Sequence, residues 1–188
     1  MTSPVRIRAA ETLVRLVLEA ANAVTSRSGE TRGKVQLRLL EAFRDALLPL
    51  QTEDREVSVA NHSTDVDIHK IILEGLKSIL ENCGETLVSG WDLAFEIIDS
   101  IFISRRFGSE DRRGSQSQPE ILMTRSVKLI KSSFSSLQLI CSDFLASLPN
   151  ACFLRLVDTL YKFCSQDDDL NVALTVSISP VLAINFLI

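Results

Sequence analysis

The chain has 188 residues, of which 46 % are hydrophobic and 23 % are charged, with only seven glycines and five prolines. This composition indicates a globular protein long enough to bury a core and excludes a disordered segment. The net charge of −4 is small and the twenty basic residues are scattered, so the sequence lacks the basic footprint of a nucleic-acid-binding protein.

The first third of the chain predicts two helices separated by a polar break. Ser3 and Pro4 suit a helix start, because serine caps free amide groups and proline fits the first turn. This helix should run to about Thr25, where the stretch SRSGETRG interrupts it. A second helix is expected to stop near Pro49, and the polar stretch QTEDREVSVANHSTD after it predicts a surface loop.

The middle of the chain predicts a helical hairpin. Ser63 or Thr64 is expected to cap a third helix, which ends at Gly84 because glycine can adopt the left-handed conformation. Gly90 and the preceding serine should open a fourth helix. The expected apolar faces are Ile68, Ile71, Ile72, Leu76, Ile79 and Leu80 in the third helix, and Trp91, Ala94, Phe95, Ile98, Ile101 and Phe102 in the fourth.

The last part of the chain predicts a loop followed by further helices. Residues 104–119, SRRFGSEDRRGSQSQP, carry no periodic apolar pattern and should form a mobile loop. A long helix is expected from Pro119, with a bend or division at its serine-rich centre, KSSFSS. Another helix should follow Pro149, and SQDDDL should cap a last one. The apolar residues assigned to the helix after Pro149 are Phe153, Leu156, Val157, Leu160 and Phe163.

Two segments of the chain resemble one another weakly. EIIDSIF at 96–102 and RLVDTLY at 155–161 each fall in the second helix of an expected pair, with an acidic residue and a hydroxyl in the same places. Repeated helical pairs without any strand signal predict an all-α fold, a HEAT- or armadillo-like α-solenoid of stacked antiparallel hairpins. We expect residues 1–175 to form this domain and residues 176–188 to form an apolar tail.

The carboxyl end, Leu170 to Ile188, contains no charged residue over nineteen positions. That length is close to a membrane-spanning helix. However, Pro180 and two asparagines interrupt it and no basic anchor follows. The stretch therefore has three interpretations, namely a buried terminal helix, which we favour, an aberrant tail, or a membrane span.

The polar clusters of the sequence do not predict a metal site or a catalytic site. His62, Asp65, Asp67 and His69 could suggest a metal site, but acidic residues near a helix start are better explained by the helix dipole. The same reasoning applies to the DDD run at 167–169. Cys141, Ser142 and Asp143 cannot form a nucleophilic relay, because neighbouring residues on a helix point in different directions. Nucleotide-binding and hydrolase motifs are also missing, so we expect a non-enzymatic protein without a metal or cofactor.

Cysteine use and the amino terminus favour a cytosolic protein. The four cysteines are Cys83, Cys141, Cys152 and Cys164. Their spacing fits no zinc or redox motif, and each lies in an apolar, helix-like context, which predicts buried, reduced thiols. The first residues, MTSPVRIRAAETL, lack the apolar core of a signal peptide.

Five residues are candidates for interaction. Trp91, the single tryptophan, is more typical of a core plug between helices than of a partner hot spot. The pairs Arg105-Arg106 and Arg112-Arg113 of the 104–119 loop could contact an acidic membrane surface, although a solvated loop is the simpler interpretation. Arg112-Arg113-Gly114-Ser115 also fits a basophilic kinase pattern, which arises easily by chance.

The amino-acid sequences of several long segments resemble fungal members of the Mon-two family. The proteins of this family are similar to the large Arf guanine-nucleotide exchange factors but lack their catalytic exchange domain. The resemblance covers most of residues 4–175. GETLVSGWDLAFEII is similar to a helical region downstream of that domain in the exchange factors. The segments that carry the resemblance are PVRIRAAETL, DREVSV, DIHKIILEGLKSILENCGETLVSGWDLAFEIIDSIF and SFSSLQLICSDFLASLPNACFLRLVDTLYKFCSQDDDLNVALT.

The resemblance implies a fragment of a long helical scaffold on the cytosolic face of the trans-Golgi and endosomes. Its implied associates are a Dopey-type scaffold protein, an Arf-like small GTPase and an aminophospholipid flippase. There are no catalytic residues to transfer, and only Ser89, Gly90, Trp91 and the LQLICSDFLASLP helix match as structural signatures. A lipid-binding helical module is the alternative. An active exchange factor is disfavoured, because the chain has no acidic loop for that catalysis.

The chain departs from the family pattern after DLNVALT. The family is expected to continue with an aromatic-rich helix containing a Trp-Asn pair, whereas this chain reads VSISPVLAINFLI. We hypothesise that these last thirteen residues derive from an unspliced intron or a faulty gene annotation. Transcript sequencing that reads continuously across the codons for Thr175 and Val176 to a genuine stop would contradict this hypothesis.

Overall fold

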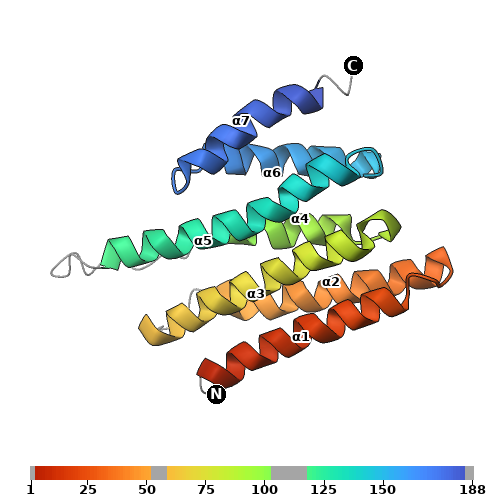
Figure 1. The fold of residues 1–188 in the computed structure, drawn as a ribbon, viewed down its shortest axis with the longest axis horizontal. Coiled ribbons are helices and arrows are strands. Elements are labelled where there is room, and N and C mark those ends of the chain that lie inside the picture. Colours follow the sequence, from red (N-terminus) through yellow and green to blue (C-terminus); the bar gives the residue numbers. More distant parts are fainter. Residues whose placement is uncertain (1–2, 52–58, 103–117, 185–188) are drawn as a thin grey trace.

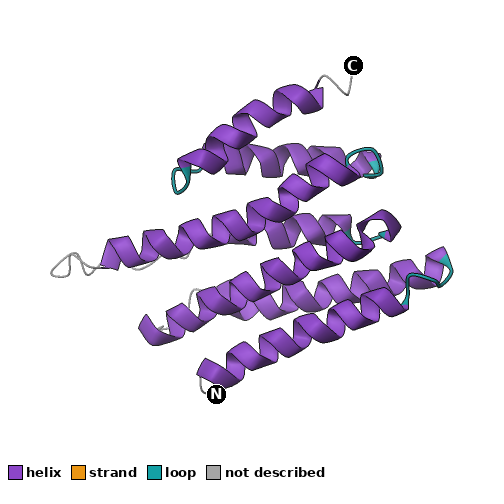
Figure 2. Ribbon diagram, in the orientation of Figure 1, coloured by secondary structure: helices purple, strands orange, loops and turns teal. Residues whose placement is uncertain are grey.

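A computed structural model describes residues 3–51, 59–102 and 118–184. Within these ranges the chain forms seven α-helices and no strand (Figure 2), which confirms the all-α class. The helices are α1 (Ser3–Ala23), α2 (Gly29–Gln51), α3 (Val59–Cys83), α4 (Trp91–Asp99), α5 (Gln118–Leu139), α6 (Phe153–Ser165) and α7 (Leu170–Ile184).

The helices stack in two layers, as Figure 1 shows. Helices α1, α3 and α5 lie side by side in the front layer, while α2, α4 and α6 lie behind them. Helix α7 packs on α6 at the end of the stack. This arrangement of successive helical pairs is that of an α-solenoid, in which each pair buries its apolar face against its neighbours. The assignment to the HEAT or armadillo type stays a prediction.

Helix α3 is the centre of the core, because α1 covers one side of it and α5 the other. Its residues Ile72, Leu73, Leu76 and Leu80 are fully buried, in agreement with the apolar spacing of the sequence. Its Gly75 allows close packing, since a Cβ there would lie 2.8 Å from a methyl group of Val14 in α1. Of the face predicted for α4, Trp91, Ala94, Phe95 and Ile98 are buried too, whereas Ile101 and Phe102 lie beyond α4 in the short helix η2 (Ser100–Phe102) and are partly buried.

The turn between α3 and α4 contains two glycines with different roles. Helix α3 ends at Cys83 as predicted, but Gly84 does not adopt the left-handed conformation. A side chain is excluded there by packing, because a Cβ on Gly84 would lie 2.3 Å from Cζ of Phe144. The left-handed residue is Gly90, with φ of 99°, which caps the start of α4.

Several predicted helix boundaries are wrong. Helix α3 begins at Val59, so Ser63 and Thr64 lie inside it rather than at its cap. Helix α2 begins at Gly29, within the stretch predicted to be a break, and ends at Gln51, close to the end predicted near Pro49. Thr64 is buried inside α3 rather than placed at a helix start, so its capping preference does not set the boundary.

The serine-rich centre of α5 does not divide the helix, which is continuous from Gln118 to Leu139. Ser133 Oγ donates a hydrogen bond of 2.7 Å to the carbonyl of Ile98, and Ser135 Oγ donates one of 2.9 Å to the carbonyl of Lys131. These hydroxyl groups are thus satisfied without breaking the helix. The regular α-helix ends at Leu139 and is followed directly by a π-helix of five residues, η3 (Ile140–Phe144).

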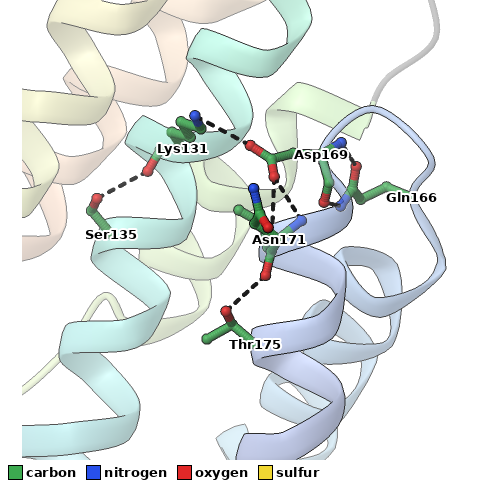
Figure 3. A network of polar contacts seen from close by, with 7 residues as sticks. Lys131, Ser135, Gln166, Asp169, Asn171 and Thr175 are labelled. Atoms are coloured by element: carbon green, nitrogen blue, oxygen red, sulfur yellow. Dashed lines mark hydrogen bonds and ion pairs between the residues drawn. The ribbon is translucent and has the colours of Figure 1, made fainter.

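Helix α7 is capped as the sequence predicts. Asp169 Oδ1 accepts hydrogen bonds from the backbone amides of Asn171 at 3.0 Å and Val172 at 3.1 Å (Figure 3). The helix runs across the predicted boundary at residue 175, and the separate tail 176–188 stays a prediction. Among the helices of the described ranges, none has both the length and the apolar character needed to cross a bilayer.

Candidate interaction surface

Trp91 lies in the core at the first turn of α4. Its side chain is 3 % exposed, and its ring makes a tilted contact with Phe144, with 6.0 Å between the ring centroids. This position agrees with the core role predicted for it. A role for Trp91 in partner binding stays a prediction. Because the indole is buried, it would affect a partner only indirectly, by holding α4 in place.

A polar clasp holds the start of α4 against α2. The buried side chain of Gln36 donates a hydrogen bond of 3.0 Å to the carbonyl of Thr86 and accepts one of 3.0 Å from the amide of Val88. Ser89 Oγ donates one of 2.6 Å to the carbonyl of Gly33. Sequence reasoning missed Gln36, because a single glutamine in an amphipathic helix carries no signal of a buried partner. The clasp makes the Ser89-Gly90-Trp91 segment a structural junction.

The four arginines predicted as an interaction site lie outside the described residues. Arg105, Arg106, Arg112 and Arg113 all fall within 103–117. Their proposed contact with an acidic membrane stays a prediction. The 104–119 loop falls in the same interval, except for its last two residues, which begin α5.

The two segments that resemble one another meet at an ionic cluster between α4 and α6. Asp99 of the first segment is buried, and its Oδ2 lies 2.8 Å from Lys162 Nζ and 3.5 Å from Arg155. Asp158 of the second segment lies 2.7 Å from the same Lys162. Burial lowers the pKa of Lys162, but its hydrogen bonds to Asp158 and Asp99 outweigh this, so the pKa lies above its usual 10.5.

The acidic and histidine residues of α3 make structural contacts. Asp65 is paired with Arg6 of α1, and His69 Nε2 lies 2.7 Å from Ser100 Oγ. The predicted capping role of Asp65 and Asp67 is wrong, because α3 begins several residues earlier at Val59. The described residues contain no group of three or more His, Cys, Asp or Glu side chains that could hold a metal ion.

The cysteines are unpaired thiols in different environments. Cys83 and Cys152 are buried as predicted, whereas Cys141 is partly buried and Cys164 is exposed, which corrects the expectation for these two residues. The Cys164 thiol lies 3.1 Å from Ser177 Oγ of α7. Burial raises the pKa of the Cys141 thiol to about 11. Since the thiolate is the nucleophilic form, Cys141 is poorly suited to catalysis.

Exposed apolar side chains gather on the last two helices. Val157, which the sequence places in the core, is 60 % exposed, although α6 packs against α4 and α7. The members of this α6–α7 apolar surface are Leu154, Val157 and Tyr161 on α6 and Leu170 and Leu174 on α7, with exposed fractions from 51 % to 84 %. The spacing 154, 157 and 161 is the signal that could have found it, because it marks a second apolar stripe on α6.

An extended stack of helical pairs, with polar contacts used to fasten one helix to another, defines the class of helical-repeat proteins. No family model matches the chain, and no solved structure matches it significantly. The chain is similar to the protein MON2 homolog of Schizosaccharomyces pombe, with 34 % identity over 172 residues. This match covers 90 % of the chain but 10 % of the relative.

Two further relatives carry the same family name. Protein MON2 of Saccharomyces cerevisiae is 30 % identical over 138 residues, covering 71 % of the chain and 8 % of the relative. The human protein MON2 homolog is 30 % identical over 121 residues, covering 64 % of the chain and 6 % of the relative. The chain therefore belongs to the Mon-two (MON2) family, as predicted, and corresponds to about a tenth of the length of its fission-yeast relative.

Proposed function

We propose that the chain is part of a non-enzymatic scaffold in vesicle-mediated protein transport between the trans-Golgi, endosomes and vacuole. The observation that carries this proposal is membership of the Mon-two family. The scaffold acts as a peripheral protein on the cytosolic face of trans-Golgi and endosome membranes. Its partners are a Dopey-type scaffold protein, an Arf-like small GTPase and an aminophospholipid flippase.

The physical character of the chain supports a scaffold. Stacked helical pairs present a long surface, which suits the binding of macromolecules better than the enclosure of a small substrate. The buried polar groups described above, such as Asp99, Gln36 and Ser133, hold helices together. Such contacts fix the shape of the stack, and partners then bind to side chains on its outside.

Proximity labelling tests this proposal. The chain is fused to a labelling enzyme and expressed in a fungal cell, and the biotinylated proteins are identified by mass spectrometry. A variant with Arg105, Arg106, Arg112 and Arg113 changed to serine is run beside it, together with an unrelated helical-repeat protein as the control. Enrichment of a Dopey-type protein or an Arf-like GTPase over the control is expected.

The outcome of the labelling is decisive once the fusion is shown to be helical by circular dichroism. A folded fusion that labels none of these proteins above the control contradicts the scaffold role of this segment. Equal labelling by the arginine variant assigns binding to the helical stack, whereas loss of labelling in that variant assigns it to the 104–119 loop.

A further inference from the structure

The turn between α6 and α7 begins with a serine that acidic residues follow. Ser165 is the last residue of α6, and Asp167, Asp168 and Asp169 come after the intervening Gln166. A serine or threonine with an acidic residue three positions later is the pattern that acidophilic protein kinases select by charge. Short patterns of this kind arise easily by chance, so the fold has to show which of them a kinase could reach.

The pattern occurs four times among the described residues, and the fold closes three of the four. The acceptor residues are Thr64, Ser78, Ser89 and Ser165. Thr64 is 4 % exposed. Ser78 lies inside α3, where the two residues that follow it are buried. Ser89 Oγ is bonded to the carbonyl of Gly33 at 2.6 Å. Of these four residues, Ser165 alone remains as an accessible acceptor.

Ser165 and the acidic residues after it are open to solvent. The side chains of Ser165, Asp167 and Asp168 are exposed, and the Ser165 hydroxyl makes no hydrogen bond to a residue that the structure describes. Gln166 has φ of −80° and ψ of 146°, so the chain is extended directly after the serine. A kinase cleft has to receive the acceptor and the residues after it, and these residues already lie outside a helix.

A phosphate on Ser165 would meet an unfavourable environment. It would carry about −1.5 to −2 charges at neutral pH. It would lie at the carboxyl end of α6, which is the negative end of the helix dipole, beside the exposed carboxylates of Asp167 and Asp168. The cation one turn earlier on α6, Lys162, is already bonded to two carboxylates, at 2.8 Å and 2.7 Å. Repulsion is therefore expected to outweigh attraction.

The turn that this phosphate would disturb positions the start of α7. Gln166 Nε2 donates a hydrogen bond of 2.6 Å to the carbonyl of Asp169, and the amide of Asp169 donates one of 2.7 Å to Gln166 Oε1 (Figure 3). Asp169 in turn caps α7. Because Gln166 is the neighbour of Ser165, a displacement of the serine reaches the cap of α7 through these two hydrogen bonds.

We propose that Ser165 is a phosphorylation site for an acidophilic serine kinase and that its phosphate loosens the turn that holds α7. In the transfer, Ser165 Oγ forms a bond to the γ-phosphorus of ATP as the bond between that phosphorus and the bridging oxygen of ADP breaks. ADP leaves with the electron pair of the broken bond, and the hydroxyl proton passes to a carboxylate of the kinase. The inference depends on the α6–α7 turn and not on the transport role.

Phosphorylation in vitro tests the site. The folded chain is incubated with casein kinase II, an acidophilic kinase, and MgATP, and the product is analysed by intact and fragment mass spectrometry. The test variants are Ser165→Ala, which removes the acceptor, and Asp168→Asn, which removes the acidic residue three positions later. Asp143→Asn is the matched control, because it removes an exposed carboxylate that belongs to none of the four patterns.

One phosphate should be added to the folded chain, on Ser165, and none to the Ser165→Ala variant. Asp168→Asn should slow the reaction by about tenfold or more, because a charge that the kinase selects is lost, and Asp143→Asn should leave the rate unchanged. Absence of phosphate, phosphate on another residue, or equal rates for Asp168→Asn and the parent chain overturns the proposed site.

Hydrogen exchange measures the consequence of the modification. The phosphorylated chain should exchange its α7 amides about fivefold to tenfold faster than the chain incubated without ATP, while α3 is unchanged, and its thermal unfolding midpoint should fall by about 2–4 °C. Ser165→Ala, treated with kinase and ATP, is the control and should keep the rates of the parent chain. Exchange in α7 that the phosphate leaves unchanged or slows overturns the proposed loosening. Failure of the proximity-labelling experiment would leave the inference intact, because the kinase reaction needs only this chain.

Discussion

Single residues fix the junction between α3 and α4, and Gly90 is the most constrained of them. Its φ of 99° lies in the region that other residues enter only with strain, and a Cβ would lie 2.6 Å from Leu40 Cδ1. Gly90→Ala should therefore lower the free energy of unfolding by about 1–3 kcal/mol, measured by urea denaturation. Gly29→Ala is the control, because no atom lies within 4 Å of a Cβ there. Equal effects of the two changes would contradict the assignment.

Asp169 combines two roles at the start of α7. It caps the helix, and its Oδ2 lies 3.5 Å from Lys131 Nζ of α5 (Figure 3). Asp169→Ala should lower the free energy of unfolding by about 1–2 kcal/mol, a typical cost for loss of a helix cap. Asp168→Ala, at the exposed neighbouring position, is the matched control and should have a small effect. Chemical denaturation followed by circular dichroism measures both.

The thiols are expected to differ in reactivity. Cys164 is exposed, whereas burial raises the pKa of Cys141 to about 11, which leaves about a hundredfold less thiolate than the usual 9.0 would give. When the chain is treated with a thiol reagent at pH 8, one cysteine, Cys164, should therefore react rapidly. The substitution Cys164→Ser should abolish this rapid phase of the reaction. Rapid reaction of a second thiol in the native chain would show that the core opens at Cys141, Cys83 or Cys152.

At the scale of elements, the ionic cluster of Asp99 and Lys162 fastens α6 to α4. Lys162→Met leaves the buried carboxylate of Asp99 with Arg155 alone, at 3.5 Å, and should lower the free energy of unfolding by about 1–3 kcal/mol. Asp158→Ala, which removes a half-exposed partner of the same lysine, should cost less than about 1 kcal/mol. Thermal denaturation of both variants gives the comparison.

The pH dependence of this contribution follows from the sign of the shift. The folded-state pKa of Lys162 lies above its usual 10.5, so its stabilisation is fully present below pH 10.5 and is lost as the pH rises through the higher folded value. The difference between Lys162→Met and the parent chain should therefore be constant from pH 6 to 9. A difference that fades within this interval would show that another group titrates.

Sequence reasoning located the seven α-helices of the described residues, most of them from a long and regular apolar periodicity, but not the short 3-10 helices between them. Ile72, Leu76 and Leu80 repeat at the helical spacing, and they are buried as that spacing predicts. The predicted start of α3 at Ser63 or Thr64 is wrong because a capping preference is a weak local signal, and the helix begins at Val59. Local signals identify helices well, whereas tertiary contacts decide where helices end.

The candidate surface was less predictable than the fold. Val157 has the apolar character of a core residue, and only its place in the stack shows that the side chain is exposed. The Gln36 clasp joins residues that are fifty positions apart, which no local pattern can indicate. The resemblance to the family could be detected from whole segments such as GETLVSGWDLAFEII, because it depends on sequence similarity over most of the chain rather than on a short motif.

At the scale of the whole molecule, the stack predicts a gradient of local stability. Helix α3 is packed between α1 and α5, whereas α7 packs on α6 at the end and reaches α5 through few contacts, the Lys131–Asp169 pair among them. In a solenoid each repeat is stabilised by its neighbours, so helices covered on one side open more easily. Native-state hydrogen exchange should therefore show the slowest amides in α3 and the fastest helical amides in α7.

Hydrogen exchange of the α7 amides can also be compared between the parent chain and the Asp169→Ala variant. Asp169→Ala should raise exchange in α7 while leaving α3 unchanged, because the lost contacts lie at the end of the stack. Uniform exchange across all helices would mean that the chain unfolds as one cooperative unit, and that the end of the stack is already as stable as its centre.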